Sequence, residues 1–287
     1  MTLELHATPD EVMRAVDALQ TYGNASQVTE KILFGLKLAL EECASNIVNH
    51  SLRRNARQTF RVTLERVGNS MILELRDRGP EFDPTQVPVM GKEASHEGRP
   101  SGGLGVHLAR HYTDEMRYRR ECGENVLYLT KRLDASARPE VTLLQDTITE
   151  TKPQLDKTMP LEIKIRPNVG GPHPEAVTVT LNGSLDTSTA PELLRRLSTA
   201  LDGPVKDLVF DLAHLKFITS AGLAVFAVAR NKLKERGGQP AFVNMQPQIK
   251  EVFDIMKALP PNVKIFQDQA ELDSYLAVRQ RSYQEGK

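Results

Sequence analysis

The stretch Leu40-Glu41-Glu42-Cys43-Ala44-Ser45-Asn46-Ile47-Val48-Asn49-His50 ends a long apolar-periodic segment that predicts a helix over residues 26–50. At about 100° per residue, the apolar residues fall on one side, whereas Glu42 and Asn46 share another, with His50 nearby. A carboxylate and an amide at positions i and i+4 can converge on one ligand. The carboxylate can deprotonate a nucleophile, and the amide oxygen can help hold Mg²⁺. A solvated helix face is the alternative for this segment alone.

A second polar motif follows an apolar strand and reads Leu73-Glu74-Leu75-Arg76-Asp77-Arg78-Gly79-Pro80-Glu81-Phe82-Asp83-Pro84. Asp77 at the strand end can accept a hydrogen bond from an exocyclic amine. Gly79 lets a flat ring approach the backbone, because it has no Cβ. An ordinary exit from strand to turn is the alternative.

A third motif, Ser101-Gly102-Gly103-Leu104-Gly105-Val106-His107-Leu108-Ala109-Arg110, runs from glycines into an apolar helix. Free backbone N–H groups at the positive end of a helix dipole are suited to binding phosphate. The motif is not a P-loop, because no Lys-Ser/Thr pair follows it, and it does not follow a strand as a dinucleotide fingerprint does.

The residues around these motifs predict a two-layer α+β domain, with an antiparallel sheet and helices on one face. A capped start at Thr8-Pro9 predicts a first helix, and Gly68-Asn69 predicts the turn of a β-hairpin. The expected strands cover residues 3–6, 59–66, 70–77, 115–121 and 125–133, and a further helix covers residues 104–112.

In this order, the three motifs resemble the N, G1 and G2 boxes of the GHKL ATPase superfamily. The short segment between the second and third motifs makes the chain most similar to the anti-sigma-factor serine kinases. The resemblance covers residues 3–133 and implies a Bergerat-type Mg-ATP site. Glu81 departs from the pattern, because many members carry a second Gly there. The implied roles are a general base at Glu42, Mg²⁺ binding at Asn46, adenine binding at Asp77 and Gly79, phosphate binding at Gly102, Gly103 and Gly105, and a further nucleotide-site position at His50.

Residues 134–160 read DASARPEVTLLQDTITETKPQLDKTMP, with three prolines and no sustained apolar period. This composition predicts a linker with room for a short strand at residues 141–144. We therefore expect an ATPase domain over residues 1–135, a linker over 136–160 and a second domain over 161–280.

The second half alternates strands and helices, which predicts a smaller α/β domain with helices packed on one sheet. The expected strands cover residues 161–166, 177–181, 208–211, 241–243 and 263–266, and the expected helices cover 190–201, 221–236, 249–258 and 269–278. Its segments 181–192 and 208–223 resemble the STAS domain of anti-sigma-factor antagonists. By position, Ser220 matches the phosphoacceptor serine of that family, and Thr219 stands where antagonists often have Asp.

Together the resemblances imply a partner-switching regulator, in which an ATP-dependent protein-serine kinase is fused to an antagonist module. The expected partners are a sigma factor, a separate STAS-type antagonist, its own STAS domain or a second copy of the chain. Two alternatives remain open: a nucleotide-gated binding module without kinase activity, and a scaffold whose STAS domain is a docking unit. Intact Glu42, Asn46 and Asp77 argue against the scaffold.

Composition is typical of a soluble cytoplasmic protein. The 37 Lys and Arg residues balance 37 Asp and Glu residues, so no broad nucleic-acid surface is expected. No apolar run approaches the roughly 20 residues that span a bilayer. We expect Cys43 and Cys122 to be reduced core thiols.

Overall fold

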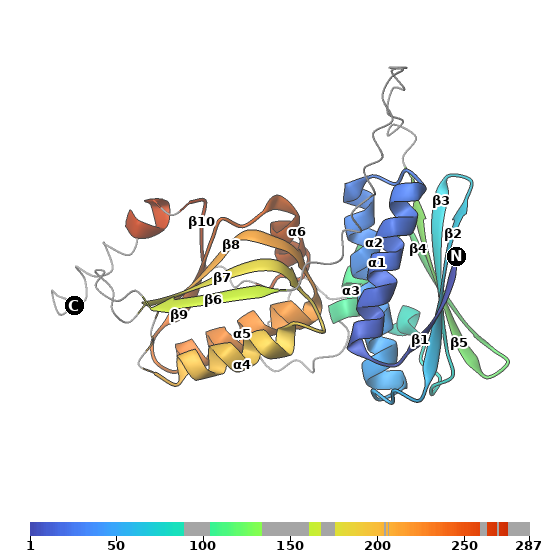
Figure 1. Cartoon of the computed structure of the whole chain (residues 1–287), viewed down its shortest axis with the longest axis horizontal. Helices are drawn as coiled ribbons and strands as arrows, with labels where there is room; N and C mark the ends of the chain where they lie inside the picture. Colours follow the sequence, from blue (N-terminus) through green and yellow to red (C-terminus); the bar gives the residue numbers. More distant parts are fainter. Residues whose placement is uncertain are drawn as a thin grey trace, which may run out of the picture. The chain divides into compact units, whose positions relative to one another are not determined.

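The computed structural model describes residues 1–88, 104–133, 161–167, 176–203, 205, 207–258, 263–268 and 270–274. They form two compact units, one N-terminal and one C-terminal, which Figure 1 colours along the sequence from blue to red. Gly102 and Gly103, the expected linker and its short strand lie outside the described residues. Of the helix expected over 269–278, residues 270–274 are described and are helical.

The N-terminal unit contains a five-stranded antiparallel sheet in the order β1-β2-β3-β5-β4. Alternation of apolar and polar residues gives the sheet one buried and one open face. The predicted hairpin between residues 59–66 and 70–77 is present, and its turn contains Gly68 with φ of +58°. The strands are β1 (Thr2–His6), β2 (Thr59–Val67), β3 (Ser70–Asp77), β4 (Glu115–Glu121) and β5 (Glu124–Arg132).

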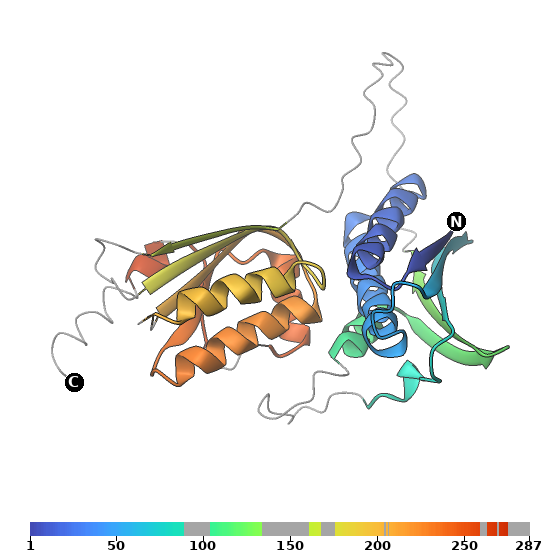
Figure 2. The ribbon, with the colours of Figure 1, turned by 60° about the horizontal axis from the view of Figure 1, so that its bottom comes forward.

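Helices cover only the buried face of this sheet, as Figures 1 and 2 show. They are α1 (Pro9–Ala25), α2 (Glu30–Asn46) and α3 (Leu104–Tyr112), with a π-helical turn η1 (Ile47–Ser51) and a 3-10 turn η2 (Pro84–Gln86). Thr8 caps α1 by accepting a hydrogen bond from the Glu11 N–H. This arrangement confirms the α+β fold class.

The long helix predicted over residues 26–50 is wrong at both ends. It begins at Glu30, because Ser26 closes the end of α1 and Gln27 has a positive φ of 55°. It also does not continue as an α-helix to residue 50. The Leu52 N–H bonds to the Ile47 carbonyl, and this i to i+5 spacing shifts the phase of the side chains after Asn46.

The C-terminal unit contains a mixed five-stranded sheet in the order β10-β9-β8-β7-β6, in which only the β6–β7 pair is antiparallel. Helices α4 and α5 lie side by side along it (Figures 1 and 2). This confirms the smaller α/β fold, although β8 is much longer than the predicted 208–211. The elements are β6 (Glu162–Pro167), β7 (Ala176–Leu185), α4 (Ala190–Leu201), β8 (Asp207–Ile218), α5 (Ser220–Lys234), β9 (Gln239–Val243), α6 (Pro247–Ile255) and β10 (Lys264–Phe266).

The two cysteines differ in environment. Cys43, a residue of α2, is buried in the core, as expected, but Cys122 is exposed at the turn between β4 and β5, with φ of 49°. The prediction of two core thiols is therefore wrong for Cys122, because a two-residue turn leaves its side chain outside both faces of the sheet. In the part of the chain that the structure describes, no helix is both long and apolar enough to cross a membrane.

Candidate functional site

Asp77 lies at the end of β3 on the buried face of the sheet and is 6% exposed. Its Oδ1 accepts three hydrogen bonds, from the Ser51 hydroxyl, from the Gly79 N–H at 2.8 Å and from Asn125 Nδ2 at 3.1 Å. No described residue donates a hydrogen bond to Oδ2. One carboxylate oxygen is thus fixed by the protein, and the other keeps its capacity to accept a donor from a ligand.

The close packing around residue 79 requires a glycine, and the Gly79 N–H also bonds to Asp77. A Cβ at this position would collide with Ser51 Oγ and would stand 2.8 Å from Asp77 Oδ1. A residue with a side chain would therefore displace Ser51 or the Asp77 carboxylate. Asp77 and Gly79, which the sequence motif places two residues apart, thus pack directly against each other in the structure.

Asn125 and Ser51 were not found by sequence reasoning. Asn125 is in register with Asp77 across β3 and β5, and besides bonding Asp77 its Nδ2 donates to the Pro80 carbonyl at 2.9 Å. Its Oδ1 accepts from Tyr118 and Arg120 at 2.8 and 2.7 Å. These bonds hold the loop after β3 in place. The only signal in the sequence was a polar residue on the inward-facing side of a predicted strand.

Glu42 is buried in α2, being 4% exposed, so the solvated-face alternative does not hold for it. Its partner in space is Gly105, near the start of α3, where a Cβ would collide with the Glu42 carboxylate. The first turn of α3 therefore packs directly on this carboxylate. The structure brings the first and third sequence motifs together through this contact.

Asn46 and His50 differ in placement. Asn46 is the last residue of α2, half-buried and one α-helical turn after Glu42. His50 is exposed on η1. Ser51, which ends η1, bonds to Asp77, so this segment connects the helix of Glu42 to the loop of Asp77. Gly102 and Gly103 lie outside the described residues.

Arg110 ties α3 to the loop after β3. Its guanidinium donates to the carbonyls of Pro84, Thr85 and Val87 at 2.8, 2.8 and 2.6 Å. Three charge-assisted bonds from one side chain fix both the end of this loop and the helix that carries Gly105.

Cys43 belongs to the first motif, directly after Glu42, but it is not a candidate nucleophile. Burial raises the pKa of its thiol, and the carboxylates of Glu42 and Glu41 raise it further. A thiol in this environment stays protonated at neutral pH and is therefore unreactive.

In the C-terminal unit, Ser220 is the first residue of α5 and is half-buried. Thr219 before it is fully buried, and its hydroxyl makes no hydrogen bond with a described residue. Gly222 brings the helix onto β7, because a Cβ there would stand 2.8 Å from the Leu185 carbonyl oxygen. The turn at the end of β7 is held by Asp186, whose Oδ1 accepts from Ser188 and Thr189.

Comparison with known families matches the histidine kinase-like ATPase domain to residues 5–131 and the STAS domain to residues 161–272. The serine/threonine-protein kinase BtrW of Bordetella bronchiseptica is 30% identical over 129 residues, which are 45% of this chain and 91% of that protein. BtrV of the same organism, named as an anti-sigma factor antagonist, is 31% identical over 75 residues, which are 26% of this chain and 65% of that protein.

Among solved structures, an anti-sigma factor antagonist from Mycobacterium paratuberculosis aligns with a TM-score of 0.35 and 23% identity, covering 42% of this chain and 94% of that one. The family matches confirm both resemblances and follow the order of the two units. The chain belongs to the family of histidine kinase-like ATPase domains related to serine/threonine-protein kinases, and its ATPase domain is followed by a STAS domain.

Proposed function

We propose that this chain is a Mg-ATP-dependent protein-serine kinase of a cytoplasmic partner-switching pathway, with a STAS half of the antagonist type. The observation that carries the proposal is the contact between Glu42 and Gly105. It joins a buried carboxylate to the N-terminal turn of a helix, and this turn is the part of a helix that attracts phosphate. Phosphoryl transfer needs such positioning more than unusual side chains.

The residues of the buried face fit a nucleotide. The free Oδ2 of Asp77 suits the exocyclic amine of adenine, and Gly79 leaves space beside it. We assign the phosphates to the backbone N–H groups at Gly102, Gly103 and Gly105, and a further contact to His50. When bound, Mg-ATP supplies the phosphoryl group and a cation that neutralises its charge.

Asn46 is the proposed protein ligand to the cation. Among the described residues, no group of three or more His, Cys, Asp or Glu side chains could hold a metal ion. Mg²⁺ usually keeps water and phosphate ligands and takes only one or two from protein, so a single amide oxygen is enough for the proposed role. Glu42, one turn away in the same helix, is then the base that accepts the proton of an incoming serine hydroxyl.

The proposed acceptor is Ser220 or the matching serine of a separate STAS protein. One half of this chain is similar to a protein named as a kinase, and the other half is similar to a protein named as an antagonist. This combination supports a system in which kinase and antagonist modules bind each other or other partners in turn. A sigma factor is the other proposed partner of the ATPase unit. Ser220 can also be phosphorylated by the ATPase unit of a second copy of the chain.

A docking role for the STAS unit is the second candidate. Thr219 favours it, because a fully buried hydroxyl stands where antagonists often have an aspartate. In that case the ATPase unit phosphorylates only a separate protein, and Ser220 stays unmodified.

Mass spectrometry after incubation with Mg-ATP tests both candidates. The wild-type chain, Glu42→Ala and Ser220→Ala are compared, each alone and with an added STAS-type antagonist. Phosphate on Ser220 of the wild type, lost in Glu42→Ala, supports the kinase with an acceptor in the same chain. Phosphate on the added protein alone supports the docking role, and phosphate on neither contradicts the kinase proposal.

A further inference from the structure

A recess opens at the end of the ATPase sheet and encloses about 320 Å³. Arg76 precedes Asp77 in β3, so the pleat places the two side chains on opposite faces of the sheet. The recess is therefore built largely from the open face, away from Glu42 and Gly105. Its charged lining consists of Arg57, Arg61, Arg76, Arg78, Glu4, Glu124 and, from the buried face, Asp77.

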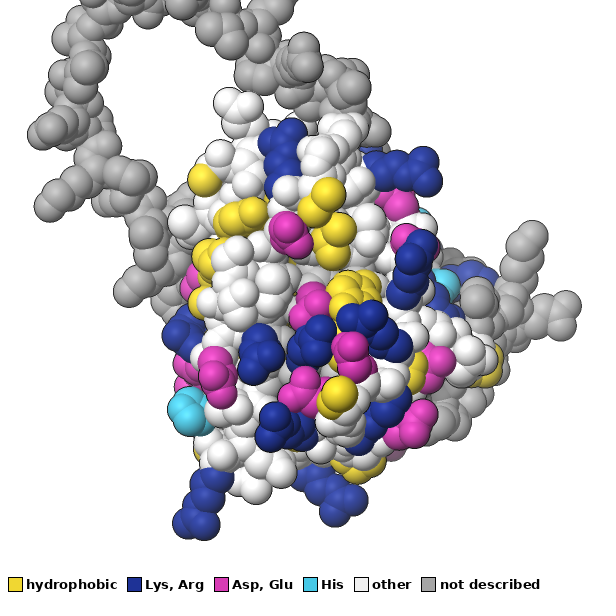
Figure 3. All heavy atoms as spheres, turned by 90° about the vertical axis from the view of Figure 1, so that its right-hand side faces the viewer, with side chains coloured by type: hydrophobic (Ala, Val, Ile, Leu, Met, Phe, Trp, Pro, Cys, Tyr) yellow, Lys and Arg dark blue, Asp and Glu magenta, His cyan; other side chains and the backbone are white. Residues whose placement is uncertain are grey.

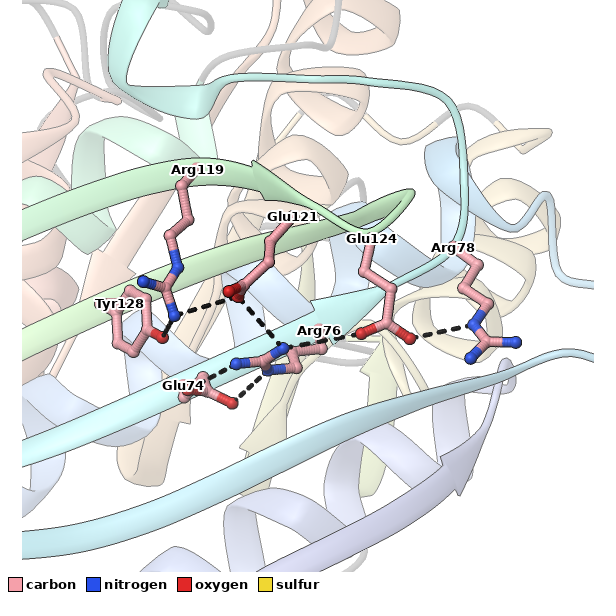
Figure 4. Close-up of polar contacts among 7 residues, drawn as sticks. All are labelled: Glu74, Arg76, Arg78, Arg119, Glu121, Glu124 and Tyr128. Atoms are coloured by element: carbon pink, nitrogen blue, oxygen red, sulfur yellow. Dashed lines mark hydrogen bonds and ion pairs between the residues drawn. The ribbon is translucent and has the colours of Figure 1, made fainter.

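Two of these arginines are neutralised by carboxylates, as Figure 4 shows. Arg76 lies 2.5 Å from Glu74, 3.6 Å from Glu121 and 3.7 Å from Glu124. Arg78 lies 2.9 Å from Glu124, and this hydrogen bond lowers the pKa of the Glu124 carboxyl below its usual value. Three carboxylates thus hold the Arg76 and Arg78 guanidinium groups in one network.

The other two arginines have no carboxylate within ion-pair distance, and Arg61 acts on Glu124 only from farther away, where its charge helps to lower the pKa of that carboxyl. The guanidinium groups of Arg57 and Arg61 make no hydrogen bond or ion pair with any described residue. Arg61 is directly opposite Arg76 across β2 and β3, and like charges in that position are destabilising. Glu4 is opposite Arg61 on its other side, but its carboxylate accepts from the Thr59 hydroxyl at 3.1 Å.

The guanidinium groups without a carboxylate partner indicate what fits. Four guanidinium groups border the recess together with three carboxylates, those of Glu4, Glu124 and Asp77. Asp77 is on the buried face and is bonded to Ser51, Gly79 and Asn125. The two guanidinium groups that have no carboxylate within ion-pair distance, Arg57 and Arg61, can together offset a phosphate group, which carries about −1.5 to −2 at neutral pH. A carboxylate would neutralise only one. Planar guanidinium forks also match phosphate oxygens in pairs.

We propose that this arginine recess binds a phosphate group, either as a free anion or on a phosphorylated side chain. Figure 3 views the open face of the sheet and shows basic and acidic side chains interleaved across it. We therefore expect the recess to bind its ligand through charged side chains and not through apolar contacts. The proposal does not depend on the kinase reaction, since Arg57 and Arg61 are not residues of the proposed nucleotide site, although Asp77 also borders the recess.

The test is calorimetric titration of the full chain, held in saturating Mg-ADP so that the nucleotide site is occupied. The probes are inorganic phosphate, a phosphoserine peptide and the same peptide with unmodified serine. Arg57→Ala and Arg61→Ala should each weaken phosphate binding by at least about tenfold, because each removes a charge-assisted contact. Arg117→Ala is the matched control, since Arg117 is on the same face, pairs with Glu115 at 2.6 Å and does not line the recess.

Binding of either phosphate probe that is lost in both recess variants and kept in Arg117→Ala supports the proposal. Tighter binding of the phosphopeptide than of inorganic phosphate identifies a phosphorylated side chain as the source, and equal binding identifies a free anion. Absence of binding to the wild type, or binding unchanged in variants that melt at the wild-type temperature, overturns it. If Arg61→Ala unfolds, the exposed Arg57 position carries the test by itself.

Discussion

Helices α3 and α5 each have a glycine in the first turn that permits close packing, but the groups opposite the two glycines differ. Gly105 in α3 lies against the carboxylate of Glu42, whereas Gly222 in α5 lies against Leu185 and Ile218. The first contact joins a helix start to a buried acid, and the second joins a helix to an apolar sheet. A glycine at a helix start is therefore a sign of close approach, and only the opposite group indicates whether the approach serves chemistry or packing.

Gly105→Ala should have the largest effect on phosphoryl transfer. The added Cβ collides with the Glu42 carboxylate and displaces it. Loss of a general base costs about 10²–10⁴ in rate, and a similar loss is expected here. The measurement is transfer of labelled phosphate from ATP to an added STAS-type antagonist, so that the acceptor is not in the mutated unit, with Gly222→Ala as the matched control that keeps the wild-type rate. Equal rates in both variants would remove the functional distinction between the two helix starts.

Asp77→Asn should weaken nucleotide binding by about 10- to 150-fold, which corresponds to the 1.5–3 kcal/mol of a hydrogen bond to a charged group. The amide can still accept at one oxygen but presents an NH₂ where the free carboxylate oxygen was. Calorimetric titration with ADP measures the loss. Asp114→Asn, at a surface position of the same unit, should bind like the wild type, and unchanged binding in Asp77→Asn would reject the adenine assignment.

Gly222→Ala should lower the free energy of unfolding of the STAS unit by about 1–3 kcal/mol, the usual cost of overpacking. The new methyl group would press on the Leu185 carbonyl and Ile218. Denaturant unfolding followed by a probe in the STAS unit measures this cost, while nucleotide affinity stays at the wild-type value. A variant as stable as the wild type would show that α5 can shift to admit the methyl group.

Ionisation of Asp114 should make a small contribution to the pH dependence of the stability of the ATPase unit, and none to that of the STAS unit. Burial opposes ionisation, but the Arg132 N–H and the Lys131 ammonium outweigh it and hold the pKa of Asp114 below its usual value. Its contribution to stability is therefore present above about pH 3.9 and lost as the pH falls through the lower folded value. Asp114→Asn should reduce this acid dependence by less than about 1 kcal/mol, because the pair is at the surface. Identical acid unfolding curves would show that the pair contributes nothing.

Local patterns predicted the elements well where each element depends on its own residues. The α3 helix and the hairpin at Gly68 are examples, since periodicity and a turn glycine are local signals. The partners of Asp77 could not be predicted in the same way, because Asn125 comes from a strand 48 residues away. Contacts of that kind depend on sheet register, which a single sequence does not specify.

The π-helical turn shows the same limit at short range. Periodicity predicted one helix through residue 50, and the change of spacing over Ile47–Ser51 places Ser51 against Asp77. A tertiary hydrogen bond therefore accompanies the departure from the local pattern. The pairing of Glu42 with Asn46 was predicted from helix geometry, but the contact of Glu42 with Gly105 required the fold.

The most direct test of the proposed kinase is Glu42→Ala, with ADP affinity and phosphoryl transfer measured on the same preparation. Removing the carboxylate should leave ADP affinity within a few-fold of the wild type, because Asp77 and the helix start remain. Transfer of phosphate to a serine should fall by about 10²–10⁴, as expected for loss of a general base. Transfer at the wild-type rate in Glu42→Ala, or none from the wild type to its own STAS unit or an added antagonist, would contradict the proposal.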